Sequence, residues 1–267
     1  GDFESVLADA QRLGYAEADP TLDVEGGDSA HKATILASLA HGFWTGFENT
    51  YVEGIRHVSS FDVELADELG YTIKLLAIIK GGERVPVEVR VHPTLIPHDH
   101  VLASVGGAYN GVVVRGDVVG ETMFYGLGAG AEATSSAVIA DVADAVLDQK
   151  FGSTLRVPPF VAHRLNAGLR TIDDVESRYY LRLTVQDRSG VVAKVSQVLG
   201  DAGISIASVL QREAPEPAPG EEPSGHVPLV FMLHTARDRV VRDAVAAIDQ
   251  LDVVTAPTII LRVENFD

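Results

Sequence analysis

The stretch YAEADPTLDVEGGDSAHK, residues 15 to 32, gathers five carboxylates ahead of one lysine. The carboxylates are those of Glu17, Asp19, Asp23, Glu25 and Asp28. The lysine, Lys32, could transfer protons if partial burial lowered its ammonium pKa against the opposing effect of the nearby acids. The stretch is therefore either an anionic pocket built around a working lysine or a solvated loop before a well-capped helix.

The helix that starts near Asp28 bears on this choice. At about 100° per residue, Asp28 and Lys32 share an arc with the large apolar residues, which are Ile35, Leu36, Leu39 and Phe43. The opposite arc carries polar residues, namely Thr34, Ser38, His41 and Thr45. We expect the apolar arc to be buried and Lys32 to be partly desolvated. A surface Asp–Lys pair four residues apart, worth about 0.3–0.5 kcal/mol, explains the same spacing, and both interpretations stay open.

Three other groups of residues are weaker candidates. The glycine-rich stretch GLGAGAEAT (126–134) could bring its amides close to a phosphate, but it lacks the GxGxxG spacing and could equally be a close-approach turn. His92, His98 and His100 match no familiar zinc pattern, so we expect no metal site. The serine pair after the glycine stretch has no evident His and Asp partners for nucleophilic hydrolysis.

The composition limits the classes of function. With 267 residues, 46% hydrophobic and 22% charged, the chain fits a soluble globular protein of one large or two smaller domains. A formal net charge of −17 disfavours nucleic acid and membrane partners. The chain has no cysteine, no run of about 20 apolar residues and no secretory signal, so we expect a cytoplasmic protein. Its start at Gly1, within a helical pattern, suggests the middle of a longer protein.

Hydrophobic periodicity predicts an α+β fold for the first 150 residues. Helices are predicted at residues 3–13, 29–44, 62–70 and 136–149. Strands are predicted at residues 71–80, 85–96 and 110–120. Residues 151–178 contain two adjacent prolines and separate two patterned regions, and we interpret them as a linker.

The last part of the chain alternates more regularly between strand and helix patterns. Strands are predicted at residues 180–188, 204–213, 226–236 and 258–265, and helices at 191–203 and 240–251. This βαββαβ order is the ferredoxin-like arrangement. The segment EAPEPAPGEEPSG (213–225) is too rich in Pro, Glu and Gly to pack, and we expect a mobile hairpin tip. Pro228 should lie on an edge strand or near the start of its strand.

Four motifs, in order along the first 150 residues, carry a family resemblance: GYAEADPTLDVEGGDSAHKATILA, ELGYTIKLLAI, VHPTLIP and FYGLGAGAEATSSAVIADV. Together they resemble homoserine dehydrogenase. The stretch ESRYYLRLTVQDRSGVVAKV resembles the C-terminal ACT domain of the monofunctional form. The resemblance implies a substrate-binding and dimerisation domain, a mixed sheet with helices, over residues 1–150. The linker and a regulatory ferredoxin-like ACT domain over residues 179–267 would follow.

The resemblance implies an NAD(P)-dependent oxidoreductase that interconverts L-homoserine and L-aspartate 4-semialdehyde in threonine and methionine biosynthesis. By its place in the family's motif, Lys32 would donate the proton to the aldehyde oxygen during reduction. Glu17 would bind the substrate amino group, with Asp23 and Asp28 beside it. These roles would explain the excess of acids, because a bound ammonium group needs carboxylates around it.

The same resemblance implies that Gly128 and Gly130 lie near the cofactor. The main cofactor site would belong to an N-terminal Rossmann domain, and no strand–GxGxxG–helix unit occurs in this sequence. We therefore expect a fragment that is inactive alone. The residues that would distinguish NAD from NADP are not among those present.

For the ACT segment, the resemblance implies threonine as an effector, bound near the strand–helix loop from Asp187 to Gly190. Ser189 stands where proline is common, and we expect it to cap the following helix. The resemblance also implies a homodimer or a higher homo-oligomer. The alternative function is a non-catalytic, threonine-binding dimerisation module that has no cofactor domain.

Overall fold

The computed structural model describes residues 3–12, 19–82, 85–128, 130–153, 168–212 and 225–266. The helices are α1 (Phe3–Arg12), α2 (Thr21–Val24), α3 (Gly27–His41), α4 (Ser60–Glu68), α5 (Ala131–Phe151), α6 (Val191–Asp201) and α7 (Asp238–Ile248). The strands are β1 (Tyr51–Val52), β2 (Tyr71–Gly82), β3 (Val85–Pro97), β4 (Tyr109–Gly116), β5 (Gly120–Leu127), β6 (Glu176–Gln186), β7 (Ile206–Gln211), β8 (His226–Arg237) and β9 (Val254–Val263). Short 3₁₀ helices are η1 (Phe47–Asn49), η2 (Val101–Ser104) and η4 (Ile172–Asp174).

One mixed sheet runs through both halves of the chain, in the order β1-β3-β9-β6-β8-β7, with β2 also paired to β3. Strand β2 pairs with β3 antiparallel along almost its full length. Strands β1 and β9 both pair with β3 in parallel, β1 at Arg90 and Val91 and β9 at Thr94 and Leu95. The end of β1 therefore lies beside the end of β9 along β3, where the two halves of the chain meet.

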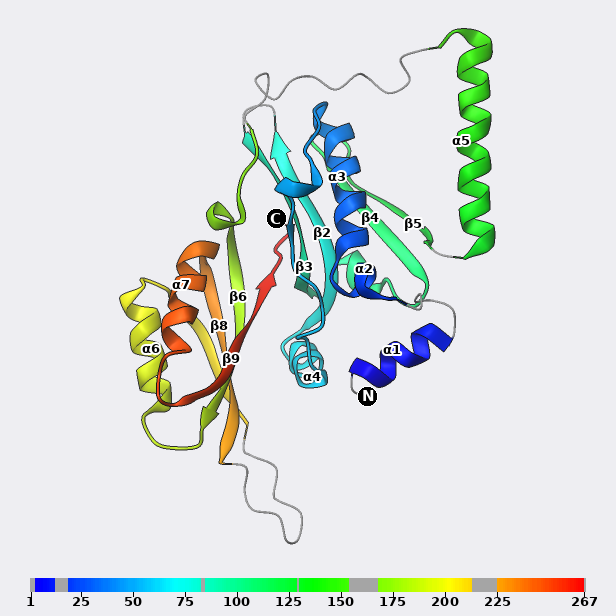
Figure 1. The fold of residues 1–267 in the computed structure, drawn as a ribbon. Helices are drawn as coiled ribbons and strands as arrows, with labels where there is room; N and C mark the ends of the chain where they lie inside the picture. Colours follow the sequence, from blue (N-terminus) through cyan, green and yellow to red (C-terminus); the bar gives the residue numbers. More distant parts are fainter. Residues whose placement is uncertain are drawn as a thin grey trace.

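The C-terminal unit (β6 to β9) has the predicted βαββαβ order. Helices α6 and α7 cover one face of its sheet (Figure 1). Alternate residues of β6 point into this core, as a strand period of two requires, and they are Tyr179, Leu181, Leu183 and Val185. Pro228 lies in the first residues of β8, before the pairing with β7 begins at Leu229.

Helix α4 of the N-terminal unit (α2 to β5) packs on the opposite face of the C-terminal sheet. Leu65 and Ala66 of α4 join a second core that includes Tyr180 of β6. A capping box between Ser59 and Asp62 starts this helix. Buried Asp62 also accepts hydrogen bonds from Tyr180 at 2.8 Å and from Arg182 at 2.6 Å. Both faces of the C-terminal sheet are thus covered, one by its own helices and one by α4.

The β4–β5 hairpin and helix α5 are much more exposed. The predicted single strand over 110–120 is wrong, because the chain turns after Gly116 and returns as β5. Helix α5, all of whose residues are described, buries none of them and stands apart from the large sheet (Figure 1). Half of the predicted linker, residues 154–167, and nearly all of the predicted hairpin tip, residues 213–224, lie outside the described residues. Within the described ranges, no helix combines the length and apolar character needed to cross a lipid bilayer.

Candidate active site

The acidic turn (residues 19–28) contains α2 and leads into α3. It packs against the residues that follow β1. The backbone N–H of Ile55 donates to the carbonyl of Val24 at 2.9 Å, and Arg56 Nε donates to Glu25 at 2.8 Å. Gly26 has φ +80°, and a Cβ on it would lie 3.2 Å from a Val91 methyl of β3. Glycine at this position therefore lets the turn pass close over the sheet.

The carboxylates of the acidic turn have different roles. Asp19 accepts the N–H of Thr21 at 3.1 Å at the start of α2, and hydrogen bonds from Thr21 lower the Asp19 pKa. Asp23 is exposed in α2. Glu17 lies outside the described residues. The structure thus describes Asp23 and Asp28 but not the third predicted substrate ligand.

Asp28 and Lys32 form the predicted i,i+4 pair on α3. Lys32 Nζ donates to Asp28 Oδ2 at 2.5 Å. The side chains are 63% and 38% exposed, respectively. Because water screens a pair this exposed, it stabilises the helix by only about 0.3–0.5 kcal/mol. Its main effect is to fix the direction of the Lys32 ammonium beside the acidic turn.

Helix α3 buries the face opposite to the predicted one. Its small residues Ala30, Ala33 and Ala37 pack against valines of β3, which are Val87, Val89 and Val91. Two hydroxyl residues, Thr34 and Ser38, are buried on the same side. Each donates its hydroxyl to the carbonyl four residues earlier, at 2.8 and 2.7 Å. The hydroxyls therefore need no water.

The large apolar residues of α3 point away from this core. Ile35, Leu36 and Leu39 are each about half exposed, and Phe43, beyond the end of the helix, is buried. The predicted burial of the whole Lys32 arc is therefore wrong. Lys32 instead lies on an open, partly apolar face of α3.

The three candidate histidines have separate surroundings. His92 is buried in β3, where its Nε2 lies 2.6 Å from Arg90 Nη1, and burial together with Arg262 and Arg90 holds its pKa well below the usual range. His98 lies 3.3 Å from Asp67, and His100 accepts the N–H of Leu102. Among the described residues, no group of three or more His, Asp or Glu side chains is placed to hold a metal ion.

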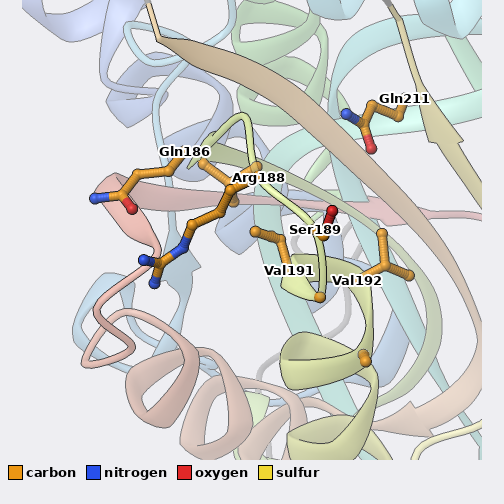
Figure 2. Close-up of a pocket in the computed structure, with 9 residues that line it drawn as sticks. Gln186, Arg188, Ser189, Val191, Val192 and Gln211 are labelled. Carbon is orange, nitrogen blue, oxygen red and sulfur yellow. The ribbon is translucent and has the colours of Figure 1, made fainter.

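A cavity of about 500 Å³ lies where β6 meets α6 (Figure 2). Its lining includes Gln186, Arg188, Ser189, Gly190 and Gln211. Gly190 has φ +89° and is the N-cap of α6, for which the described residues supply no side-chain cap. The predicted capping by Ser189 is therefore wrong.

The cavity contains only part of the predicted effector loop. Gly190 lines it, whereas Asp187 is not among the lining residues and donates its N–H to the Gly225 carbonyl at 3.0 Å. The side chains that could bind an amino acid are those of Arg188, with a charge for a carboxylate, and Gln211, with an amide. Arg188 lies within the predicted loop from Asp187 to Gly190, whereas Gln211, on β7, was not predicted.

A buried charged cluster at the junction of the two units was also missed. It includes Glu53, Arg90, Asp238, Arg262 and Glu264. Burial raises the pKa of Glu53, but hydrogen bonding from His57 and the charge of Arg262 outweigh it and lower that pKa to about 2. The sequence does show a polar residue at every second position of β3. That alternation is also typical of a strand with one face in water, so it did not indicate a buried cluster.

Comparison with known proteins assigns both parts of the chain. A family model described as homoserine dehydrogenase matches residues 1–143. The chain belongs to the homoserine dehydrogenase family. A model described as the ACT domain matches residues 179–253, which includes the cavity loop.

Individual members of the homoserine dehydrogenase family align along the whole chain. The homoserine dehydrogenase of Pseudomonas aeruginosa is 45% identical over 99% of this chain and 60% of its own length. That of Neisseria gonorrhoeae is 40% identical over 98% of this chain and 59% of its own length. The crystal structure of a homoserine dehydrogenase from Thiobacillus denitrificans matches with a TM-score of 0.86 and 42% identity, over 99% of this chain and 59% of that one. This chain therefore spans about three fifths of the length of these relatives.

The homoserine dehydrogenase family implies a nicotinamide cofactor, and the described residues do not form a complete site for one. A Cβ on Gly128 would lie 1.5 Å from Asn110 Nδ2, so this glycine makes room for Asn110 rather than for a ligand. Gly130 has φ +113° and open space beside it at the start of α5. Gly130 alone leaves room for a ligand to approach the backbone. The strand–GxGxxG–helix unit that binds a dinucleotide is not among the described elements.

Proposed function

We propose that this chain is the substrate-binding and regulatory part of an NAD(P)-dependent homoserine dehydrogenase, which interconverts L-homoserine and L-aspartate 4-semialdehyde. The observation that carries the proposal is the Asp28–Lys32 pair, which lies beside the acidic turn on the open face of α3. Both residues fall within the segment that matches the homoserine dehydrogenase model.

Lys32 donates the proton in the reducing direction and accepts it in the oxidising direction. In the reducing direction the family's nicotinamide cofactor would supply a hydride to the aldehyde carbon, and negative charge would develop on the carbonyl oxygen. The Lys32 ammonium stabilises that charge and gives the oxygen its proton. In the oxidising direction the neutral amine accepts the proton from the homoserine hydroxyl. Asp28 Oδ2, 2.5 Å from Lys32 Nζ, orients the amine for both directions.

The carboxylates of the acidic stretch bind the substrate amino group. Asp23 and Asp28 lie in consecutive helices on either side of Gly26, and Asp28 pairs with Lys32 directly. We assign Glu17 to the same group, following the family motif. A substrate whose ammonium group lies two carbons from its reacting carbon suits a site with several acids and one lysine.

The exposed apolar side chains of α3 and α5 support a site that further protein completes. Ile35, Leu36 and Leu39 on α3 and Val138 and Ile139 on α5 are roughly half exposed or more. Proteins rarely leave contiguous apolar surface open to water. The relatives are longer than this chain, and we propose that their additional domain covers these faces and closes the site over Lys32.

The test uses the full-length protein that joins this chain to a cofactor-binding domain. Lys32→Ala is expected to lower kcat for homoserine oxidation by about 10²–10⁴-fold, because the proton acceptor is lost. The matched control is Lys150→Ala, which removes an exposed lysine from the far end of α5 and should leave kcat unchanged. A Lys32→Ala enzyme with near-normal kcat would refute the assignment.

We further propose that the ACT cavity binds threonine as a regulator and that the protein is a homo-oligomer. The cavity of about 500 Å³ supports threonine binding, since it suits a small ligand and its lining includes Arg188, which in this structure pairs with Asp252. This observation also supports the alternative that the chain is a non-catalytic amino-acid sensor. Calorimetric titration of this chain with threonine should show binding that Arg188→Gln weakens at least about tenfold, by loss of a charged hydrogen bond. Arg239→Gln, on the exposed side of α7, is the control. Absence of threonine binding to the unmodified chain would contradict both regulatory roles.

A further inference from the structure

Arg262 lies where the two units meet, and charged side chains from both surround it. It is located near the end of β9, and its side chain is 2% exposed. Nη1 donates to Glu53 Oε2 at 2.8 Å, and Nε donates to Asp238 Oδ1 at 2.8 Å. The guanidinium also lies 5.0 Å from the centre of the Tyr51 ring, whose hydroxyl donates to Glu53 at 2.9 Å. An arginine buried between two carboxylates is a stiff link, because losing either partner leaves a buried charge unpaired.

The C-terminal unit fixes the position of Arg262. Strand β9 is hydrogen-bonded on both sides, with Arg262 opposite Tyr179 of β6 and Thr94 of β3. Asp238 begins α7, and its N–H donates to the Val175 carbonyl at 2.9 Å. The arginine and one of its carboxylates are therefore held by elements that do not include the acidic turn.

Glu53 links Arg262 to the residues that contact the acidic turn. It follows β1 directly, and its N–H donates to the Val91 carbonyl at 2.8 Å. The next residue, Gly54, packs so closely that a Cβ on it would lie 2.6 Å from the Val24 carbonyl oxygen. The two following residues bind the turn directly, Ile55 at the Val24 carbonyl and Arg56 at the Glu25 carboxylate. Residues 53–56 are thus the surface on which the turn before Asp28 and Lys32 rests.

We propose that Arg262 is a positioning residue for the amino-acid site of the acidic turn and acts through Glu53. The inference rests on the proposed function, because it takes the turn to be the substrate site. Arg262 sets where residues 53–56 lie against β3, and those residues set where the turn presents its acids. The ACT segment is then part of the framework of the substrate site as well as a place for an effector.

The first experiment uses this chain and the variant Glu53→Gln, which removes the charge and keeps the size of the side chain. Amide hydrogen exchange is measured at Gly26 and Ile55, whose N–H groups donate to the carbonyls of Asp23 and Val24. Exchange at both sites should become about tenfold faster or more, because local opening of the turn becomes easier. Homoserine affinity, measured by calorimetry, should fall about tenfold with it.

The control variant is Arg182→Lys, which disturbs an arginine–carboxylate pair that joins the two units away from the acidic turn. Arg182 donates to both oxygens of Asp62, at 2.6 and 3.0 Å, and so joins β6 to α4. Both variants should lower the melting temperature, but only Glu53→Gln should change exchange at the turn. Unchanged exchange in Glu53→Gln would overturn the proposal, and so would equal acceleration in Arg182→Lys.

A second experiment separates positioning from chemistry in the full-length enzyme. Arg262→Lys, which keeps the charge but loses the forked geometry, should raise KM for homoserine about tenfold and change kcat less than about twofold. A lower kcat with an unchanged KM would contradict the proposed role. If the unmodified chain binds no homoserine, the proposed function fails, and the exchange data still decide whether Arg262 positions the turn.

Discussion

The two ends of the continuous sheet differ in how completely they are covered. In the C-terminal unit, α6 and α7 bury one face and α4 buries the other. In the N-terminal unit, α3 buries one face of β2 and β3 with small side chains, while its own large apolar residues stay exposed with α5 and the β4–β5 hairpin. Within the described residues, the sheet of the C-terminal unit is thus covered on both faces, and the unit that carries Lys32 leaves apolar side chains exposed. The proposed chemistry therefore belongs to an exposed face of the molecule, and the proposed regulation belongs to its closed core.

The largest effect is expected on stability, when a leucine is replaced by alanine at each end of the sheet. Leu181→Ala, in the closed core, should lower the free energy of unfolding by about 2–5 kcal/mol, because it leaves a cavity. Leu36→Ala, on the open face of α3, should change it by less than about 1 kcal/mol, because that side chain already meets water. Urea denaturation of this chain measures both. Equal losses of unfolding free energy in the two variants would show that the exposed face of α3 is packed in solution. The two ends of the sheet would then not differ in how well they are covered.

The next effect is a dependence of stability on pH at the junction between the two ends. The pKa of Glu53 is about 2 in the folded protein, against an ordinary value of 4.5. A depressed carboxyl pKa stabilises the fold above pH 4.5, and that stability is lost as the pH falls from there toward 2. The loss for this one group is about 3 kcal/mol. Denaturation at pH 6 and pH 3 should therefore show a smaller difference in Glu53→Gln than in the unmodified chain. An identical pH dependence would mean that the junction does not depend on the Glu53 charge.

The smallest effects test whether the cavity loop is as fixed as the core beneath it. Gly190→Ala should destabilise by about 1–2 kcal/mol, because its φ of +89° is unfavourable for a residue with a Cβ. Gly200→Ala, in the helical part of α6 with open space around it, should stabilise by about 0.5–1 kcal/mol. Melting temperatures of the two variants should therefore shift in opposite directions. A Gly190→Ala chain that melts like the unmodified one would place this loop outside the closed part of the molecule.

The sequence predicted the elements of the C-terminal unit because each strand there has one face on a helical core. Alternation along β6 and the helical period of α6 and α7 follow directly from that burial. The same reasoning missed the β4–β5 hairpin, because the turn after Gly116 is short and valine-rich and looks like continued strand.

The orientation of α3 could not be predicted from apolar periodicity. Its buried side consists of alanines and of hydroxyls that are satisfied within the helix, so size and local hydrogen bonding decide the contact rather than hydrophobicity. Spacing did predict the Asp28–Lys32 pair, since residues four apart on a helix are neighbours.

The buried cluster around Arg262 was beyond sequence reasoning for a different reason. Arg262 meets Glu53 across 209 residues and Asp238 across 24 residues. No local period links such partners, and each charge alone has the pattern of an ordinary surface residue. Only the pairing of β3 with β9 brings Arg262 to Glu53.

The central place of β9 has a consequence for the order in which the molecule assembles. It follows every other described strand along the chain, yet it lies between β3 and β6 in the sheet. During synthesis, the strands on either side must wait for it, and the ion pair from Arg90 to Glu264 closes a loop of 174 residues. Pairings across so much intervening chain form slowly. The contacts of β9 with β3, and with them the junction that positions the acidic turn, can therefore form only after all the other described strands have been made.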